Sequence, residues 1–95
     1  MQIDEFDITL NTILNMKKTP WILCSYNPLL MDNSLEQFAN DEGDLGFNLS
    51  PNSIRSPKLD RETHEFSFKA SFKGTVKEVI IPVAAIKECC SLEDE

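Results

Sequence analysis

The clearest hydrophobic pattern in the chain lies in residues 65–82. Its first half has apolar side chains at every second position, namely Phe66, Phe68, Ala70 and Phe72. Alternation with a period of two is typical of a strand with one buried face. Lys73-Gly74 is a turn dipeptide, and the apolar run at 76–81 predicts a returning strand that Pro82 should end. We therefore predict a β-hairpin here, around which the other elements must pack.

An amphipathic pattern at the start of the chain predicts an α-helix over residues 4–18. Its apolar positions, which recur at helical spacing, are Phe6, Leu10, Ile13 and Leu14. Asp4 is placed to cap the first turn, and Lys17 and Lys18 suit the negative end of the helix dipole. Pro20 should keep the helix from continuing.

The remaining pattern predicts mostly strands. The run at 21–26 is almost continuously apolar and should be buried on both faces. Shorter strands are expected at 35–39, 45–49 and 54–59, with a turn at Gly43, and the alanines of 83–90 favour a final short helix. The fold class is therefore mainly β with an N-terminal α-helix, as two packed sheets or a small barrel. We expect a single domain over residues 1–90 and an acidic tail at 91–95.

One loop, at 27–34, carries apolar residues that the strand pattern does not explain. They are Leu29, Leu30 and Met31. Either they fold back onto the core, or they line a groove for a partner.

Composition narrows the classes of function. Nine Lys and Arg face 16 Asp and Glu, for a net charge of −7, which makes nucleic acid an unlikely partner. No apolar run is long enough for a membrane helix, and the acidic N-terminus is unlike a signal peptide, so we expect a cytoplasmic protein. Cys24, Cys89 and Cys90 form no metal motif, and His64, the one histidine, falls in a polar turn.

No nucleophile–base pair, phosphate loop, metal site or cofactor motif is present, so we expect no enzyme activity. The favoured interpretation is a β-rich binding module that takes an extended peptide along a sheet edge or groove. Two alternatives remain: a small β-barrel that binds RNA by stacking bases on Phe47 or Phe72, and a purely structural β-barrel module.

Three stretches of the chain resemble the stringent starvation protein B (SspB) family, whose members are adaptors for the ClpXP protease. The first is TPWIL at 19–23, where the helix meets the first strand, and the second is GDLGFNLSP at 43–51. The third is FSFKASFKG at 66–74, followed by IPVAAI at 81–86. Their order and approximate spacing agree with the family, so the resemblance covers nearly the whole domain.

The resemblance implies two packed sheets in an Sm-like arrangement and a groove that binds ssrA-type degradation tags. The peptide-binding residues that it implies are Ala70, Ser71, Phe72, Lys73 and Gly74 of the hairpin, Gln37 and Phe38 from a facing segment, and Phe47 and Asn48 from the next strand. From the residues themselves, Phe72 could equally be core, and Asn48 could equally bond a local turn. The resemblance further implies a homodimer through the helix residues Phe6, Leu10, Ile13 and Leu14, with ssrA-tagged polypeptides and the ClpX ATPase as partners.

The chain also departs from the family pattern. Ser71 stands where the family usually has arginine, and the family's long protease-binding tail does not follow residue 95. Tethering through such a tail raises the effective concentration of cargo at the protease, so we expect tag capture with delivery in doubt. Residues 39–42 read Ala-Asn-Asp-Glu, as in the ssrA tag itself. They form either an ordinary polar turn or a segment that a second chain could bind.

Overall fold

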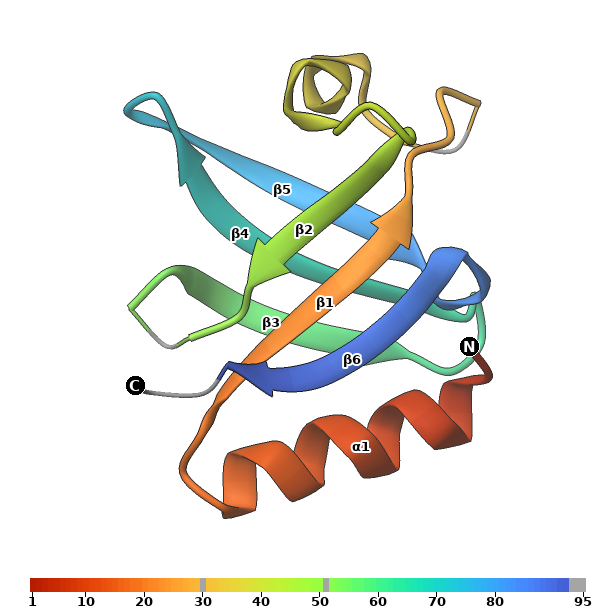
Figure 1. Cartoon of the computed structure of the whole chain (residues 1–95), viewed down its shortest axis with the longest axis vertical. Coiled ribbons are helices and arrows are strands. Elements are labelled where there is room, and N and C mark those ends of the chain that lie inside the picture. Colours follow the sequence, from red (N-terminus) through yellow and green to blue (C-terminus); the bar gives the residue numbers. More distant parts are fainter. Residues whose placement is uncertain (30, 51, 93–95) are drawn as a thin grey trace.

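A computed structural model describes residues 1–29, 31–50 and 52–92 of the 95-residue chain. The element order is α1 (Ile3–Asn15), β1 (Thr19–Ser25), the 3-10 helix η1 (Asn33–Phe38), β2 (Asp44–Asn48), β3 (Ile54–Asp60), β4 (Glu65–Phe72), β5 (Thr75–Pro82), the 3-10 turn η2 (Val83–Ala85) and β6 (Ile86–Leu92). Among these elements are two antiparallel three-stranded sheets, β2-β1-β6 and β3-β4-β5 (Figure 1). The fold is therefore mainly β with an N-terminal helix, as expected from the sequence.

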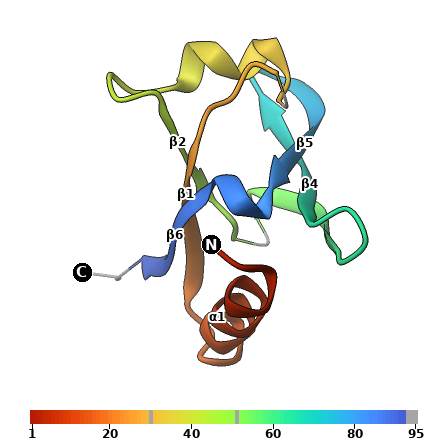
Figure 2. The same ribbon diagram turned by 90° about the vertical axis from the view of Figure 1, so that its right-hand side faces the viewer.

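The core lies between the two sheets and is closed at one end by α1. Ile22 and Cys24 of β1 face Phe66 and Phe68 of β4 in one buried cluster. Phe6 of α1 is fully buried, with its ring centroid 5.1 Å from that of Phe66 in an edge-to-face contact. Figure 2 shows the helix lying across the end of both sheets. The helix is therefore part of the core of its own chain.

The predicted hairpin is confirmed. Phe72 pairs with Thr75 across the two-residue turn at Lys73 and Gly74. These two turn residues have φ values of 53° and 83°, and two consecutive positive φ values define the type I′ turn that suits the twist of a hairpin. β5 ends at Pro82, as its missing N–H predicts.

Helix α1 is shorter than the amphipathic pattern suggested, and its ends differ from those expected. It begins after Gln2, so Asp4 lies within the first turn and does not cap it. Lys17 has a φ of 58° and donates its N–H to the Leu14 carbonyl, while the Lys18 N–H reaches the Ile13 carbonyl. This pair of bonds is the Schellman motif, here closed by a lysine in place of the usual glycine.

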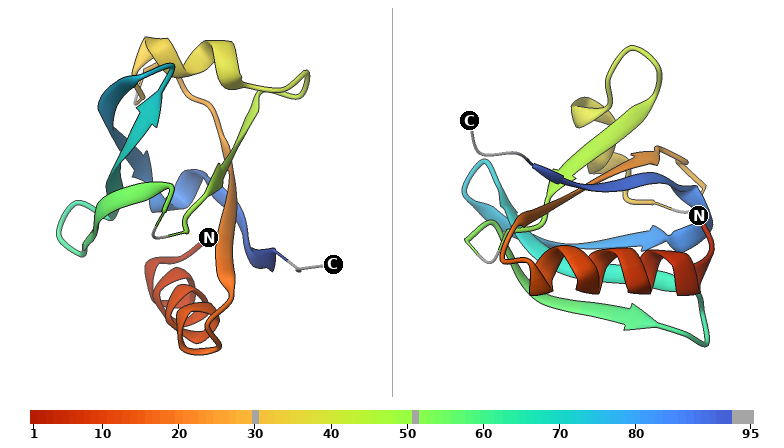
Figure 3. Two further views of the ribbon diagram at one scale, coloured as in Figure 1. Left: turned by 90° about the vertical axis from the view of Figure 1, so that its left-hand side faces the viewer. Right: turned by 60° about the horizontal axis from the view of Figure 1, so that its bottom comes forward.

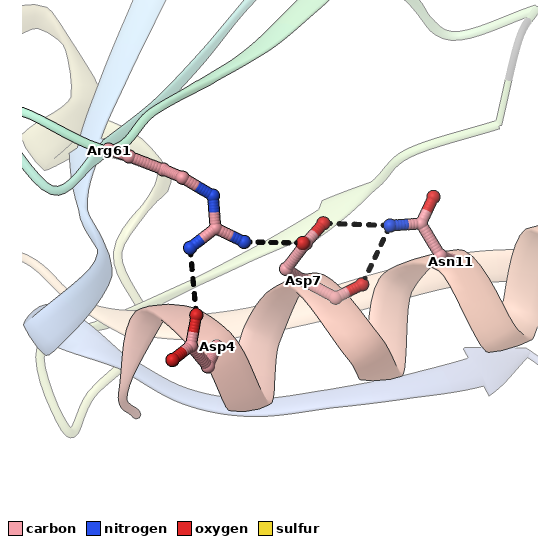
Figure 4. A network of polar contacts seen from close by, with 4 residues as sticks. All are labelled: Asp4, Asp7, Asn11 and Arg61. Atoms are coloured by element: carbon pink, nitrogen blue, oxygen red, sulfur yellow. Dashed lines mark hydrogen bonds and ion pairs between the residues drawn. The ribbon is translucent and has the colours of Figure 1, made fainter.

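Two aspartates of α1, Asp4 and Asp7, instead bind the turn between β3 and β4. Arg61, in the turn between β3 and β4, donates to the Asp4 carboxylate at 2.7 Å and to the Asp7 carboxylate at 2.6 Å. Asn11 in turn donates to Asp7 at 2.7 Å (Figure 4). The network joins α1 to the β3–β4 turn, although each exposed ion pair adds little stability.

Two of the predicted elements were wrong. Residues 35–39 form no strand, because the Asp32 carboxylate accepts the Ser34 N–H at 2.8 Å and starts the 3-10 helix η1, which buries Leu35. The helix expected at 83–90 is only the short turn η2, followed by β6. Pairing with the central strand β1 outweighs the helix preference of the alanines in this segment.

Burial and strand pairing decide three further expectations. In β1 only alternate residues are buried, so Trp21 and Leu23 lie half-buried on the outer face. In the 27–34 loop Met31 folds into the core, whereas Leu29 is 90% exposed, and Leu30 lies outside the described residues. β6 runs to Leu92, so the first two residues of the expected tail pair with β1, and residues 93–95 lie outside the described part.

Candidate functional site

The hairpin tip and the end of η1 meet, as the expected site requires. The Phe72 and Phe38 rings lie with their centroids 5.2 Å apart, and the Lys73 ammonium donates to the Gln37 side-chain carbonyl at 3.0 Å. Phe38 keeps 41% of its surface exposed and Phe72 is half-buried. Four of the expected residues thus form a partly apolar, solvent-accessible surface, which we call the tip surface: Gln37, Phe38, Phe72 and Lys73.

Phe47 does not belong to this surface. It is buried, with its ring centroid 5.4 Å from that of Phe68 in the core. A buried ring offers no face to a base or a peptide, so base stacking by Phe47 is ruled out as well. The alternation of β2 explains the burial, because Leu45 and Phe47 share its inner face.

Asn48 is exposed, but its side chain serves a local turn. Its side-chain oxygen accepts the Ser50 N–H at 2.9 Å. The backbone N–H and C=O of Asn48, in contrast, point away from the sheet. β2 is an edge strand, and Leu49 and Gly43 each bond to β1 or its extension, through Pro20 and Tyr26 respectively. In an antiparallel pair the residues in between direct their backbone groups away from the partner strand.

That alternation leaves two β2 residues, Gly46 and Asn48, with N–H and C=O groups at the open edge. The third outward-facing residue, Asp44, is already occupied, because Asn40 bonds to both of its backbone groups. Gly46 is closely covered on the outer face of the sheet, since a β-carbon there would lie 2.7 Å from the Trp21 indole. β2 therefore forms one edge of its sheet, where the backbone groups of Gly46 and Asn48 are open to a partner; we call this the open edge.

The tip surface lies close to the beginning of β2, the strand that carries the open edge. Asn40, two residues after η1, donates its N–H to the Asp44 carbonyl at the start of β2. The left view of Figure 3 shows η1 lying across the same end of the molecule as the hairpin tip and the beginning of β2. The two features thus combine backbone hydrogen-bonding groups with an aromatic surface.

Ala70 and Ser71 belong to a separate feature, which lies beside the start of β3. They help to line a pocket of about 110 Å³ that also contacts Arg55, Lys69 and Val76. Sequence patterns did not reveal Arg55 or Lys69 as site residues. Only the register, which places Arg55 opposite Lys69, brings them together. Gly74 is exposed in the turn and borders open space.

The helix residues expected at a dimer interface are mostly unavailable for one. Phe6 and Ile13 are buried and Leu10 packs against the core of the same chain. Only Leu14, at 44% exposure, remains open to a partner. That expectation is wrong for Phe6 and Ile13, because the amphipathic stripe faces the open end of the two sheets.

Burial keeps two of the cysteine thiols protonated. Burial and the nearby Asp44 carboxylate raise the pKa of Cys24 to about 12, and burial raises that of Cys89 to about 11, so both thiols are protonated at neutral pH. His64 is exposed in the β3–β4 turn. Within the described residues, no three His, Cys, Asp or Glu side chains gather in a way that could hold a metal ion, and no helix is long and apolar enough to cross a membrane.

No model of a known protein family matches the chain, and no curated protein matches it either. The resemblance to SspB therefore depends on the three quoted stretches alone.

Proposed function

We propose that this protein is a non-enzymatic cytoplasmic adaptor that captures an extended peptide, and that ssrA-type degradation tags are its ligands. The observation that carries the proposal is the open β2 edge at Gly46 and Asn48 beside the tip surface. An extended peptide added to such an edge gains directional backbone bonds, and its side chains find the aromatic surface. The tag itself, and presentation to ClpXP, come from the resemblance.

The local chemistry suits a peptide of acidic character. Lys73 lies on the tip surface. Hydrogen bonds from Ser34 lower the pKa of Asp32, at the start of η1, and the charge of Lys77 of β5 adds a smaller effect in the same direction. A cation at the tip surface attracts carboxylates. Because the chain has a net charge of −7, this surface also repels acidic ligands less than the other faces of the protein do.

Fluorescence anisotropy with a labelled ssrA peptide tests capture directly. Asn48→Pro removes the outward N–H without removing a ladder bond, and Asn48→Ala removes the same side-chain turn bond but keeps the N–H. We expect Asn48→Pro to bind at least about fivefold more weakly than Asn48→Ala, in line with the loss of one hydrogen bond. Equal affinities would remove the β2 edge from the site.

The tip surface has its own test. Phe72→Ala removes one of the two stacked rings and should weaken binding by about tenfold, the range of an aromatic pair and its buried area. Ile8→Ala, on the exposed side of α1, is the matched control and should bind as the wild type. No binding of the peptide at hundreds of micromolar would refute the proposed function.

Delivery is measured separately, from the rate at which ClpXP degrades an ssrA-tagged reporter at low substrate concentration. A faster rate in the presence of the protein is the expected result, because tethering raises local concentration. A slower rate would mean that the tag is captured and withheld, which contradicts delivery but leaves capture intact.

A further inference from the structure

The outer face of β3-β4-β5 brings two cations together, with one carboxylate, Glu78 of β5, opposite Lys69 on its far side. Arg55 on β3 and Lys69 on β4 are directly opposite each other, and both side chains are exposed. Like charges in this position destabilise a strand pair. Within the described residues, the structure records no ion pair for either. Glu78 lies on the β5 side of Lys69 and does not line the pocket, so the pocket side of the Arg55–Lys69 pair is positive and favours an anion.

The pocket beside these cations exists because β3 starts late. β3 begins with Ile54 opposite Ala70, so no β3 residue pairs with Ser71. Ser53, which would come next, instead donates its N–H to the Ser50 carbonyl at 2.9 Å. The chain turns away at this point, and the resulting gap is the pocket of about 110 Å³.

The register also determines which backbone groups of β4 face the pocket. In a two-residue hairpin the residues next to the turn are a hydrogen-bonded pair, so Phe72 and Ala70 bond to β5. Ser71, between them, directs its backbone N–H and C=O toward the side that β3 leaves open. Its hydroxyl lies on the same exposed face as Lys69, because both residues are odd-numbered positions of β4.

The walls supply further donors. They come from the Asn52 and Ser53 side chains, with the exposed Val76 of β5 closing the last side. A pocket of about 110 Å³ has room for a group of several heavy atoms, such as a carboxylate or a phosphate. The donor set, a guanidinium fork, an ammonium, hydroxyls, an amide and a backbone N–H, exceeds what the two oxygens of a carboxylate use. It matches the three terminal oxygens of a phosphate group.

We propose that this pocket binds a dianionic phosphate group, free or on a modified side chain, between Arg55 and Lys69. Arginine contributes paired hydrogen bonds to two of the oxygens and lysine contributes a point charge. The site is distinct from the open β2 edge and does not depend on tag binding.

Amide NMR during titration with inorganic phosphate, at constant ionic strength, tests the proposal. The Ser71 and Ser53 amides should shift saturably with phosphate and not with chloride. Arg55→Gln should weaken binding by about tenfold, the loss of one charge-assisted contact. Lys58→Gln is the matched control, because Lys58 lies opposite Ser67, on the same outer face as Arg55, but outside the pocket, and it should weaken binding less than about twofold.

Two peptides, one with phosphoserine and one with serine, identify the source of the phosphate. A phosphoserine peptide that binds much more tightly than inorganic phosphate would assign the site to modified proteins, and equal affinity would assign it to a free phosphate group. Both results support the proposal. Shifts that do not saturate, or that Arg55→Gln leaves unchanged while the variant keeps the wild-type spectrum elsewhere, would overturn it.

Discussion

Replacing Phe6 by alanine distinguishes a core residue from a dimer contact. Phe6 is fully buried and meets the Phe66 ring edge-to-face at 5.1 Å, within a cluster that belongs entirely to one chain. Truncating such a ring removes its buried apolar area and leaves a cavity, which costs about 3–5 kcal/mol. A domain of this size has a free energy of unfolding of only about 5–14 kcal/mol, so the loss is a large share of it.

Urea unfolding, followed by the fluorescence of Trp21, measures the effect, since this is the only tryptophan. At a slope of about 1–1.5 kcal/mol per molar urea, the midpoint of Phe6→Ala should fall by about 2 M or more. Ile8→Ala is the matched control on the same helix. Ile8 is 68% exposed, so its removal should change the free energy of unfolding by less than about 0.5 kcal/mol.

The concentration dependence decides between the two roles. A residue of the monomer core lowers stability by the same amount at low and at high protein concentration. A dimer contact lowers it by an amount that depends on concentration, because association then contributes to folding. The assignment of Phe6 to the core would be refuted if the loss were under about 1 kcal/mol or appeared only at concentrations where wild type is dimeric.

Four further measurements address other parts of the fold. Lys87→Met should cost about 2 kcal/mol or more in urea unfolding, because it leaves the buried Asp44 carboxylate without its cation at 2.9 Å; no loss would contradict a structural role for the pair. Lys17→Gly should stabilise by about 1 kcal/mol, since glycine adopts the left-handed φ without strain, and a destabilised variant would speak against the Schellman end. Thiol labelling of the native protein should be slowest at Cys24, and rapid labelling there would contradict its burial. Backbone N–H groups of Thr63 and Glu62 lower the pKa of Asp60, so its carboxylate contributes stability above the ordinary pKa of 3.8, and this contribution is lost as the pH falls through the lower folded pKa. The difference in stability between wild type and Asp60→Asn should therefore vanish over that acidic range. A difference that does not depend on pH would refute this role of Asp60.

The sequence by itself determined the parts of this protein that depend on local pattern. The alternation of phenylalanines on β4 predicted the central hairpin, and Lys73-Gly74 predicted its tight turn, because side-chain period and turn conformation are properties of short segments. The helical spacing of Phe6, Leu10 and Ile13 likewise predicted a helix with one apolar face. The charge balance of the chain needed no structure at all.

Only the tertiary structure decided what those faces and strands meet. The apolar face of α1 packs on the core of its own chain. Residues 86–92 form a strand because they pair with the free side of β1. The tip surface and the Arg55–Lys69 pair arise from contacts between residues far apart in the sequence. Such contacts depend on the register and the closing of the sheets, and a period of two or of 3.6 carries no information about either.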